Sequence, residues 1–472
     1  MNLKGIFYYL GLFCFPISFL SFLNILYSSY FDYFLNINSY IITLIISLLV
    51  GLSFFLIGKK SDKKITFYEQ IILILLIYLV VSILISIPYY LSNYQLIYID
   101  ALFESFSGVT GTGFSIFDNV KYLDPTLLLW RSSSQWVGGL YFLIFLFLFF
   151  SNNQFNFKLT KLVFSDDKSP NLEENIRKIS LRVFIFYTFL TLLIFVLFTI
   201  SGIRLFNGLN LSTTLISAGG FLPTNSLDQI IKTTTQEMFL IFSFLISMLN
   251  ILFIYNLFAE KNFLKKQYED LLIIILITFF SVLLLLFVKD LDIFHSVIYV
   301  ISSVSTSGIS IGKIDENFSL YLLFLTIIGG SIISTTSGIK AIRIYILVKA
   351  SFAEIIKLVK PNNIFNTNIF YSDNKINNEN TKLSFIVFIS FFISLFILSG
   401  VLLFDNINFE SSFKLSLLTL TNTKASNLYV LEPIDFSRLL TSSKISLIIF
   451  MTIGKIELIS IFLIFKKMFF KS

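Results

Sequence analysis

The chain has 472 residues, of which 56% are hydrophobic and only 13% are charged, and its formal net charge is +7. Soluble globular proteins carry about a quarter charged residues, so this composition indicates a polytopic membrane protein. A single cysteine, Cys14, excludes an internal disulfide and a cysteine-based metal cluster, and a single histidine, His295, excludes a polyhistidine metal site. The cations are confined to loops, so they indicate membrane topology and not affinity for nucleic acid.

A series of apolar runs is long enough to cross a bilayer, which takes roughly 20 residues in a helix. They cover residues 6–26, 41–57, 71–87, 127–150, 183–200, 238–258, 271–288, 320–348, 383–403 and 445–465. No small-residue cleavage site follows the first run, so we interpret it as a retained helix and not as a signal peptide. Lysine and arginine crowd the loops on one face, such as Lys59, Lys60, Lys63 and Lys64. The positive-inside rule places this face, and both termini, in the cytoplasm.

Residues 100–139, between two apolar runs, are too polar and too rich in glycine to span a bilayer. A short helix-like segment at 101–107 precedes the small residues Val109, Thr110, Gly111, Thr112 and Gly113. Irregular backbone at membrane depth must be buried in protein or line a wet cavity. A row of carbonyl groups around a narrow wet passage replaces the hydration shell of a cation. This stretch therefore predicts a pore loop. Asp100 and Glu104 at its start suit either the positive helix end or the attraction of cations.

Three later stretches, 211–220, 302–308 and 418–424, repeat this pattern of small residues after an apolar run. We take Gly219, Gly308 and Lys424 as the positions equivalent to Gly113. Recurrence at a similar spacing indicates one unit copied several times. The further candidate filter residues are Ser217, Ala218, Gly219 and Gly220; Ser305, Thr306, Ser307 and Gly308; and Thr421, Asn422, Thr423 and Lys424. An alternative is that the glycines only allow close packing of helices.

The predicted fold is an all-α polytopic membrane protein with four helix–pore-loop–helix repeats, arranged with pseudo-fourfold symmetry around one ion pore, plus an N-terminal two-helix hairpin. The hairpin covers residues 1–64, and the repeats cover 65–165, 166–262, 263–360 and 361–472. A secondary transporter for an organic solute also uses broken helices and repeats, but it normally has two inverted halves. Four loops that enter from one side favour the pore.

A run of glycine and hydroxyl residues interrupts the apolar span 320–348. Such residues at mid-bilayer cannot continue a lipid-facing helix, so the span is predicted to be broken. The alternative is a helix whose hydroxyl groups bond back to its own carbonyls. Lys455 lies inside the apolar span 445–465, where it either faces the protein interior or extends to the cytoplasmic interface. The candidate gate residues are Gly329, Gly330, Ser331, Ser334, Thr335, Thr336, Ser337, Gly338 and Lys455.

Four motifs resemble the Trk/Ktr/HKT superfamily of cation transporters, and the bacterial TrkH branch most closely. They lie at 100–139, 217–221, 328–343 and, as a pair, at 420–427 with 453–465. The resemblance implies one permeation path for potassium ions, in which only the carbonyl groups of the filter bind the ion. It also implies a gating loop inside the membrane, below the filter. It also implies a homodimer docked on a cytoplasmic nucleotide-binding regulatory ring called TrkA or KtrA. The chain has no Gly-x-Gly-x-x-Gly after a strand, so nucleotide sensing is expected of such a partner.

Potassium uptake is the expected function, because glycine at the position of Gly113 accompanies potassium permeation in the plant relatives. Lys424 departs from the family, which usually has glycine there. Its ammonium either points outward, or acts as a tethered cation in one ion site, or stops conduction. Sodium permeation, mixed permeation and a non-conducting member of the fold therefore stay as alternatives. The family usually has arginine at the position of Lys455. No residue set suits covalent chemistry, so neither an enzymatic activity nor an organic cofactor is expected.

Overall fold

The computed structural model describes residues 2–61, 65–151, 172–251, 254, 268–288, 291–312, 316–359, 376, 378–405, 407–430 and 434–456. These residues form α-helices and short 3-10 helices, and no strand occurs among them. Six of the described helices are long and apolar enough to cross a membrane: Leu3–Tyr30, Ile37–Gly58, Tyr68–Leu91, Ser180–Ile200, Glu269–Phe287 and Asn378–Asp405. The chain is therefore an all-α membrane protein, as predicted.

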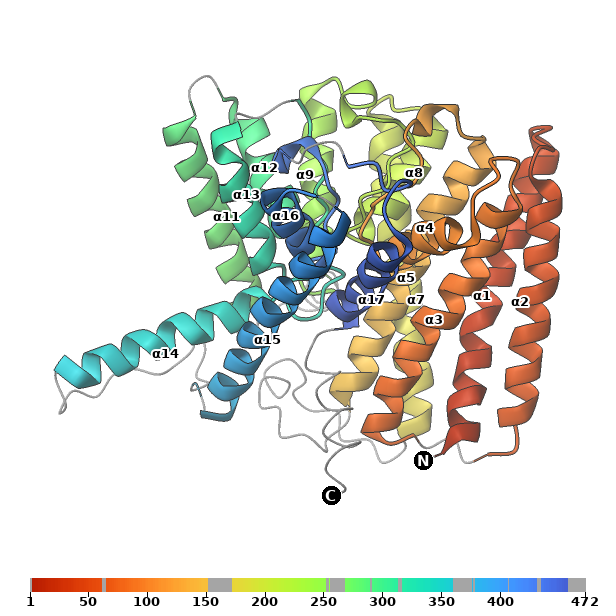
Figure 1. The fold of residues 1–472 in the computed structure, drawn as a ribbon, viewed down its shortest axis with the longest axis horizontal. Helices are drawn as coiled ribbons and strands as arrows, with labels where there is room; N and C mark the ends of the chain where they lie inside the picture. Colours follow the sequence, from red (N-terminus) through yellow and green to blue (C-terminus); the bar gives the residue numbers. More distant parts are fainter. Residues whose placement is uncertain are drawn as a thin grey trace.

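An N-terminal hairpin is formed by α1 (Leu3–Tyr30) and α2 (Ile37–Gly58), which pack against each other at one edge of the molecule (Figure 1). Glycines make this packing close. A Cβ atom on Gly11 would lie 2.6 Å from the backbone nitrogen of Phe55. Small residues that let two backbones approach are typical of helix pairs in membranes.

Four units follow the hairpin, and each contains a helix of 12 or 13 residues that follows a longer one (Figure 1). The units are α3 (Phe67–Leu91), α4 (Tyr98–Thr110) and α5 (Pro125–Ser151); α7 (Leu172–Ile200), α8 (Leu205–Ile216) and α9 (Thr234–Met248); α11 (Tyr268–Phe287), α12 (Ile293–Val304), α13 (Ser319–Ile328) and α14 (Ala341–Val359); and α15 (Asn378–Leu402), α16 (Phe409–Leu420) and α17 (Thr441–Ile456). The short helices α4, α8, α12 and α16 have 12 or 13 residues. At 1.5 Å per residue they reach about 20 Å, too little to cross a hydrocarbon core of about 30 Å.

The four units close into a ring. Helix α5 of the first unit packs on α8 of the second, α9 of the second packs on α12 of the third, and α13 of the third packs on α16 of the fourth. The ring is completed where α17 of the fourth unit packs on α4 of the first. This order makes the first and third units opposite each other, and likewise the second and fourth. The pseudo-fourfold arrangement is the predicted one.

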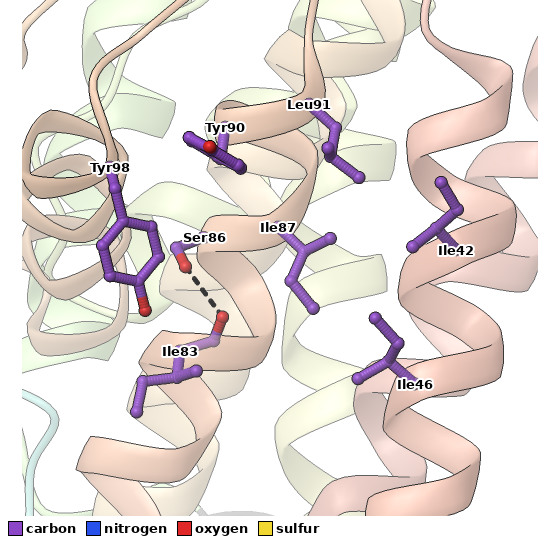
Figure 2. A pocket seen from close by; sticks show the side chains of 8 residues that line it. All are labelled: Ile42, Ile46, Ile83, Ser86, Ile87, Tyr90, Leu91 and Tyr98. Carbon is purple, nitrogen blue, oxygen red and sulfur yellow. Dashed lines mark hydrogen bonds between the residues drawn. The ribbon is translucent and has the colours of Figure 1, made fainter.

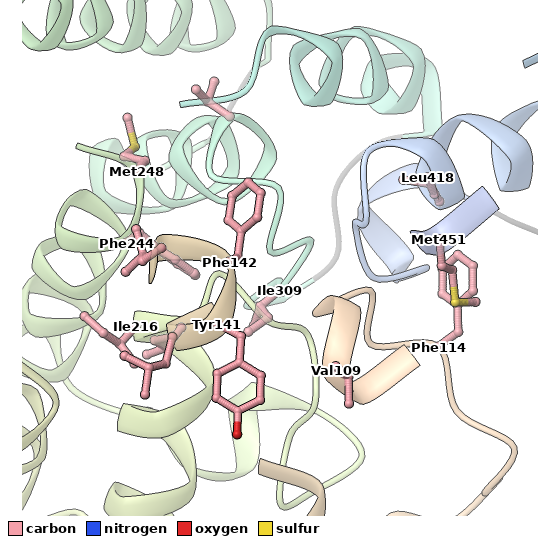
Figure 3. Packing of buried hydrophobic residues seen from close by; sticks show 14 of the residues in the cluster. Val109, Phe114, Tyr141, Phe142, Ile216, Phe244, Met248, Ile309, Leu418 and Met451 are labelled. Atoms are coloured by element: carbon pink, nitrogen blue, oxygen red, sulfur yellow. The ribbon is translucent and has the colours of Figure 1, made fainter. Parts of the chain in front are cut away.

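Buried apolar side chains from all four units pack around the ends of the short helices, among them Val109, Ile216, Ile309 and Leu418 (Figure 3). The outer surface is apolar as well. A groove along α2 and α3 is lined by Ile42, Ile46, Ile83, Ser86, Ile87, Tyr90, Leu91 and Tyr98 (Figure 2). Only one serine and two tyrosines bring polar atoms to this lining, as expected of a surface that faces lipid.

Of the predicted spans, one is broken as predicted, and another contains a helix end that was not predicted. The run 320–348 is interrupted between Ile328 and Ala341, and α14 then leaves the bundle as an arm (Figure 1). Within the run 238–258, α9 ends at Met248 because Leu249 adopts an extended backbone with ψ of 159°, and Ile251 and Ile254 are helical again. The run 445–465 is described as far as Ile456. The segments 165–174 and 361–381, whose polar composition is typical of connecting loops, lie largely outside the described residues.

Candidate functional site

The four short helices end in the same backbone turn. In each turn, one residue has a positive φ: 79° at Gly111, 54° at Ala218, 58° at Thr306 and 50° at Asn422. Each of these residues donates its N–H to the carbonyl three residues earlier. Three of the four are not glycine, and such residues seldom adopt this conformation. A shared strained turn shows that the four loops are copies of one structure.

The hydrogen bonds correct the predicted alignment of the second loop. Gly219, Ser307 and Thr423 each donate their N–H to the carbonyl five residues earlier. Gly113 and Gly308 instead donate to the carbonyl six residues earlier, one position further along. Taking Gly219 as the equivalent of Gly113 was therefore wrong by one residue. The matching residues are Gly113, Gly220, Gly308 and Lys424.

Hydroxyl pairs brace three of the loops. The Oγ1 atoms of Thr110 and Thr112 are 2.8 Å apart, and those of Thr421 and Thr423 are 2.9 Å apart. Ser305 and Ser307 form the corresponding pair at 3.2 Å.

The second loop has no such hydroxyl pair, because Gly219 follows Ser217 where the other loops have a second hydroxyl residue. Gln135 braces this loop instead. The side-chain oxygen of Gln135 in α5 accepts the N–H of Phe221 at 3.2 Å, and its amide would collide with a Cβ atom on Gly219. The sequence analysis missed Gln135, because nothing in its local pattern marks a contact 86 residues away.

The loops converge on one ring. A Cβ atom on Gly113 would lie 2.7 Å from the Cα of Gly220, and one on Gly308 would lie 2.5 Å from the carbonyl oxygen of Lys424. Between the fourth and first loops, the side-chain amide of Asn422 donates to the hydroxyl of Thr112 at 2.9 Å. The candidate filter residues of all four loops are thus brought together.

Lys424 departs from this ring of glycines. A Cβ atom built on Gly220 would lie 2.5 Å from the Cβ of Lys424 and 3.2 Å from both its Cγ and its Cδ. The lysine stem therefore lies directly against the backbone of the second loop.

The acidic residues at the first pore helix are paired with cations. Glu104 is buried and contacts the Nε of Arg131 at 2.8 Å, while it also accepts the N–H of Ile116 at 2.8 Å. Asp100 is bonded to the ammonium of Lys444 in α17 at 2.5 Å. The Arg131 guanidinium also lies 4.1 Å from the ring centre of Phe221. Asp100 thus connects the first unit to the fourth, whereas the Glu104–Arg131 pair lies within the first unit. Neither pairing was included in the two expected roles, at the helix end or in attracting cations.

The candidate gate loop, residues 329–338, contacts the ends of the short helices in the second and third units. The hydroxyl of Thr335 donates to the carbonyls of Ile216 and Ser247 at 2.9 and 3.0 Å. The N–H of Ser337 donates to the hydroxyl of Thr306 at 3.1 Å. The segment is not helical, so the alternative of a continuous helix rich in hydroxyl groups is wrong.

Lys455 joins the gate loop to the filter. Its ammonium donates to the carbonyl of Thr335 at 2.7 Å and lies 3.7 Å from the Cβ position of Gly111. It also faces the ring of Phe142 at 4.9 Å. The residue is only 2% exposed, so the alternative that it extends to the cytoplasmic interface is wrong. Lys455 thus lies between the candidate gate loop and the first candidate filter loop.

Neighbouring helices hold the gate loop from its far side. The N–H of Ile332 donates to the carboxylate of Glu269 at 2.8 Å, and the N–H of Ser331 donates to the carbonyl of Met248 at 2.9 Å. The next residue, Asp270, accepts the N–H of Asn250 at 2.8 Å. The sequence analysis missed this buried pair, because acids in the first turn of a helix are ordinarily explained by the helix dipole.

Comparisons with known proteins agree with this geometry. The family model named TrkH and described as a cation transport protein matches residues 36–270. An uncharacterized cation transporter of Methanocaldococcus jannaschii is 27% identical over 460 residues, which cover 93% of this chain and 90% of that protein. The Trk system potassium uptake protein TrkG of Escherichia coli is 25% identical over 350 residues, covering 70% and 71%. The crystal structure of the potassium transporter TrkH from Vibrio parahaemolyticus has a TM-score of 0.86 and 19% identity, and the match covers 100% of both chains.

Proposed function

Since this chain belongs to the Trk/Ktr/HKT superfamily, as a TrkH-like member, we propose that it carries potassium ions inward across the cytoplasmic membrane. The observation that carries the proposal is the convergence of four loops with one backbone conformation on a single ring. Carbonyl groups around such a passage replace the hydration shell of a bare cation. The membrane potential supplies the driving force, about 2.3 kcal/mol per 100 mV for a monovalent ion.

We assign the filter to the backbone of the four loops and the gate to residues 329–338 with Lys455. The hydrogen bonds of this loop to Ile216 and Thr306, at the ends of α8 and α12, support the assignment of a gate at one end of the passage. The Lys455 ammonium adds an electrostatic barrier at the same level. Opening would require the loop to leave these partners and the ammonium to withdraw.

We further assign the chain to a homodimer that works with a TrkA/KtrA-like regulatory ring. Support comes from the lysine-rich loops, which the positive-inside rule places in the cytoplasm with both termini. The division into a hairpin at 1–64 and pore repeats at 65–165, 166–262, 263–360 and 361–472 follows the unit order of the helices.

A second candidate function, sodium or mixed permeation, is favoured by one observation. Lys424 stands where the other three loops have glycine, so one quarter of the ring differs from an all-glycine filter. A fixed positive charge there weakens cation binding and alters the number of carbonyl groups that an ion meets.

Growth of a potassium-uptake-deficient bacterium at low external potassium tests the proposal. The chain is co-expressed with a ring partner, next to a matched Gly113→Ser variant in the first loop. We expect wild type to restore growth and Gly113→Ser to lose it, because an added side chain at Gly113 would press on Gly220. Membrane expression of both proteins is measured by immunoblot. Sodium flux without potassium flux in liposomes would instead establish the second candidate, and no flux of either ion would refute both.

A further inference from the structure

One side chain crosses the filter ring. Lys424 belongs to the fourth unit and Gly220 to the second, and these two units lie opposite each other in the ring. The Cβ, Cγ and Cδ atoms of Lys424 are nevertheless the nearest atoms to a Cβ position on Gly220. The lysine stem therefore runs along the diagonal of the ring and not away from it.

The ammonium at the end of this stem has no hydrogen bond or ion pair within the described part of the chain. Arg131 is the neighbouring charge, and it repels the ammonium. Arg131 is itself neutralised by Glu104 at 2.8 Å, so no carboxylate is left to pair with Lys424 at this level. An ammonium has three donors and is costly to desolvate without acceptors. The ammonium therefore requires oxygen acceptors of the kind that filter carbonyl groups offer to a cation.

We propose that Lys424 is a tethered cation of the filter, whose ammonium occupies the outermost cation position and competes there with external alkali ions. An ammonium ion and a potassium ion are similar in radius and take the same oxygen ligands. The flexible four-carbon stem lets the group leave and return, so the competition is reversible. This inference rests on the proposed function, because it needs a passage that binds alkali cations.

Equilibrium binding of radioactive rubidium to the purified full chain in nanodiscs tests the inference independently of gating. Lys424→Gly removes the stem and the charge, whereas Lys424→Met keeps a stem of similar length and removes only the charge. We expect both variants to bind rubidium at least tenfold more tightly than wild type. Lys121→Gln, which removes an exposed lysine from the loop after the first filter stretch, is the matched control and should bind as wild type does. Binding by Lys424→Met as weak as that of wild type would overturn the inference.

A double-mutant cycle tests the position of the stem without any ion. An added methyl group in Gly220→Ala would collide first with the Lys424 stem, whose Cβ, Cδ and Cγ are the three atoms nearest to it. We expect Gly220→Ala to lower the melting temperature in wild type and to have little effect in Lys424→Gly. Equal losses in both backgrounds would overturn the diagonal placement.

The outcomes also separate this inference from the proposed function. Potassium-dependent growth with wild type, together with equal rubidium affinities in all variants, would overturn the inference and leave the proposed function intact. Absence of rubidium binding by every folded variant would overturn both.

Discussion

Replacing Lys455 with methionine should increase ion flux, because it removes a positive charge at the inner end of the filter and keeps the length of the side chain. The Lys455 ammonium lies 3.7 Å from the Cβ position of Gly111, so an ion at that end of the filter would be about 5 Å away. At an effective dielectric constant of about 20, the repulsion is about 3 kcal/mol, which corresponds to roughly a hundredfold in rate.

The same change also loosens the gate loop. The ammonium donates to the carbonyl of Thr335 at 2.7 Å, and a hydrogen bond from a charged group contributes about 1.5–3 kcal/mol. Both effects act in one direction. We therefore expect Lys455→Met to conduct at least about a hundred times faster than the parent protein.

Rubidium efflux from liposomes measures this difference, with the parent protein and both variants reconstituted at equal density. The measurement is made in the Lys424→Gly background. If Lys424 limited the flux, removing the barrier at Lys455 would not change the measured rate. Lys455→Arg is the matched control: it keeps the charge and should stay as slow as the parent. Equal flux from Lys455→Met and Lys455→Arg, with equal melting temperatures, would refute the electrostatic argument.

Three further changes test the contacts around the passage. Glu269→Leu leaves the Ile332 N–H without its acceptor, so it should lower the free energy of unfolding by about 1–3 kcal/mol, and Glu269→Gln by less, in denaturant titration of the purified protein. Gly138→Ala forces a methyl group into the carbonyl of Val109, so rubidium binding should be lost in calorimetry while the protein stays monodisperse in size-exclusion chromatography. Arg131→Met strands the buried Glu104 carboxylate and should cost about 3–5 kcal/mol, part of which a second change, Glu104→Gln, should restore in melting experiments. An unchanged free energy of unfolding in Glu269→Leu, retained rubidium binding in Gly138→Ala, or no recovery of stability when Glu104→Gln is added to Arg131→Met would contradict the contact concerned.

The fold could be predicted from the sequence because its signals are local. Clusters of glycine and hydroxyl residues stand out within long apolar runs, and their recurrence marks four copies of one unit. The break after Ile328 was visible for the same reason. Alignment within a loop was less certain, since either of two consecutive glycines, Gly219 and Gly220, can follow the strained turn. Only the hydrogen bonds of the folded backbone distinguish them.

The residues that support the site could not be predicted, because each depends on a partner far along the chain. Gln135 reaches the second loop across 86 residues, and Glu269 reaches the gate across 63. Helix α9 likewise ends at Met248 inside an apolar run, where the N–H of Asn250 finds an acceptor in Asp270. Such contacts leave no periodicity or composition that a single sequence can reveal.

A ring built from four units of one polypeptide can change one position at a time. In a pore made of four identical subunits, one altered codon would place four ammonium groups on the same ring, where each pair would repel by roughly 2–3 kcal/mol. Here the substitution at Lys424 appears once, and the equivalent positions keep Gly113, Gly220 and Gly308. Fusion of the repeats thus allows an asymmetric ring, in which one position changes while the three equivalent positions keep glycine.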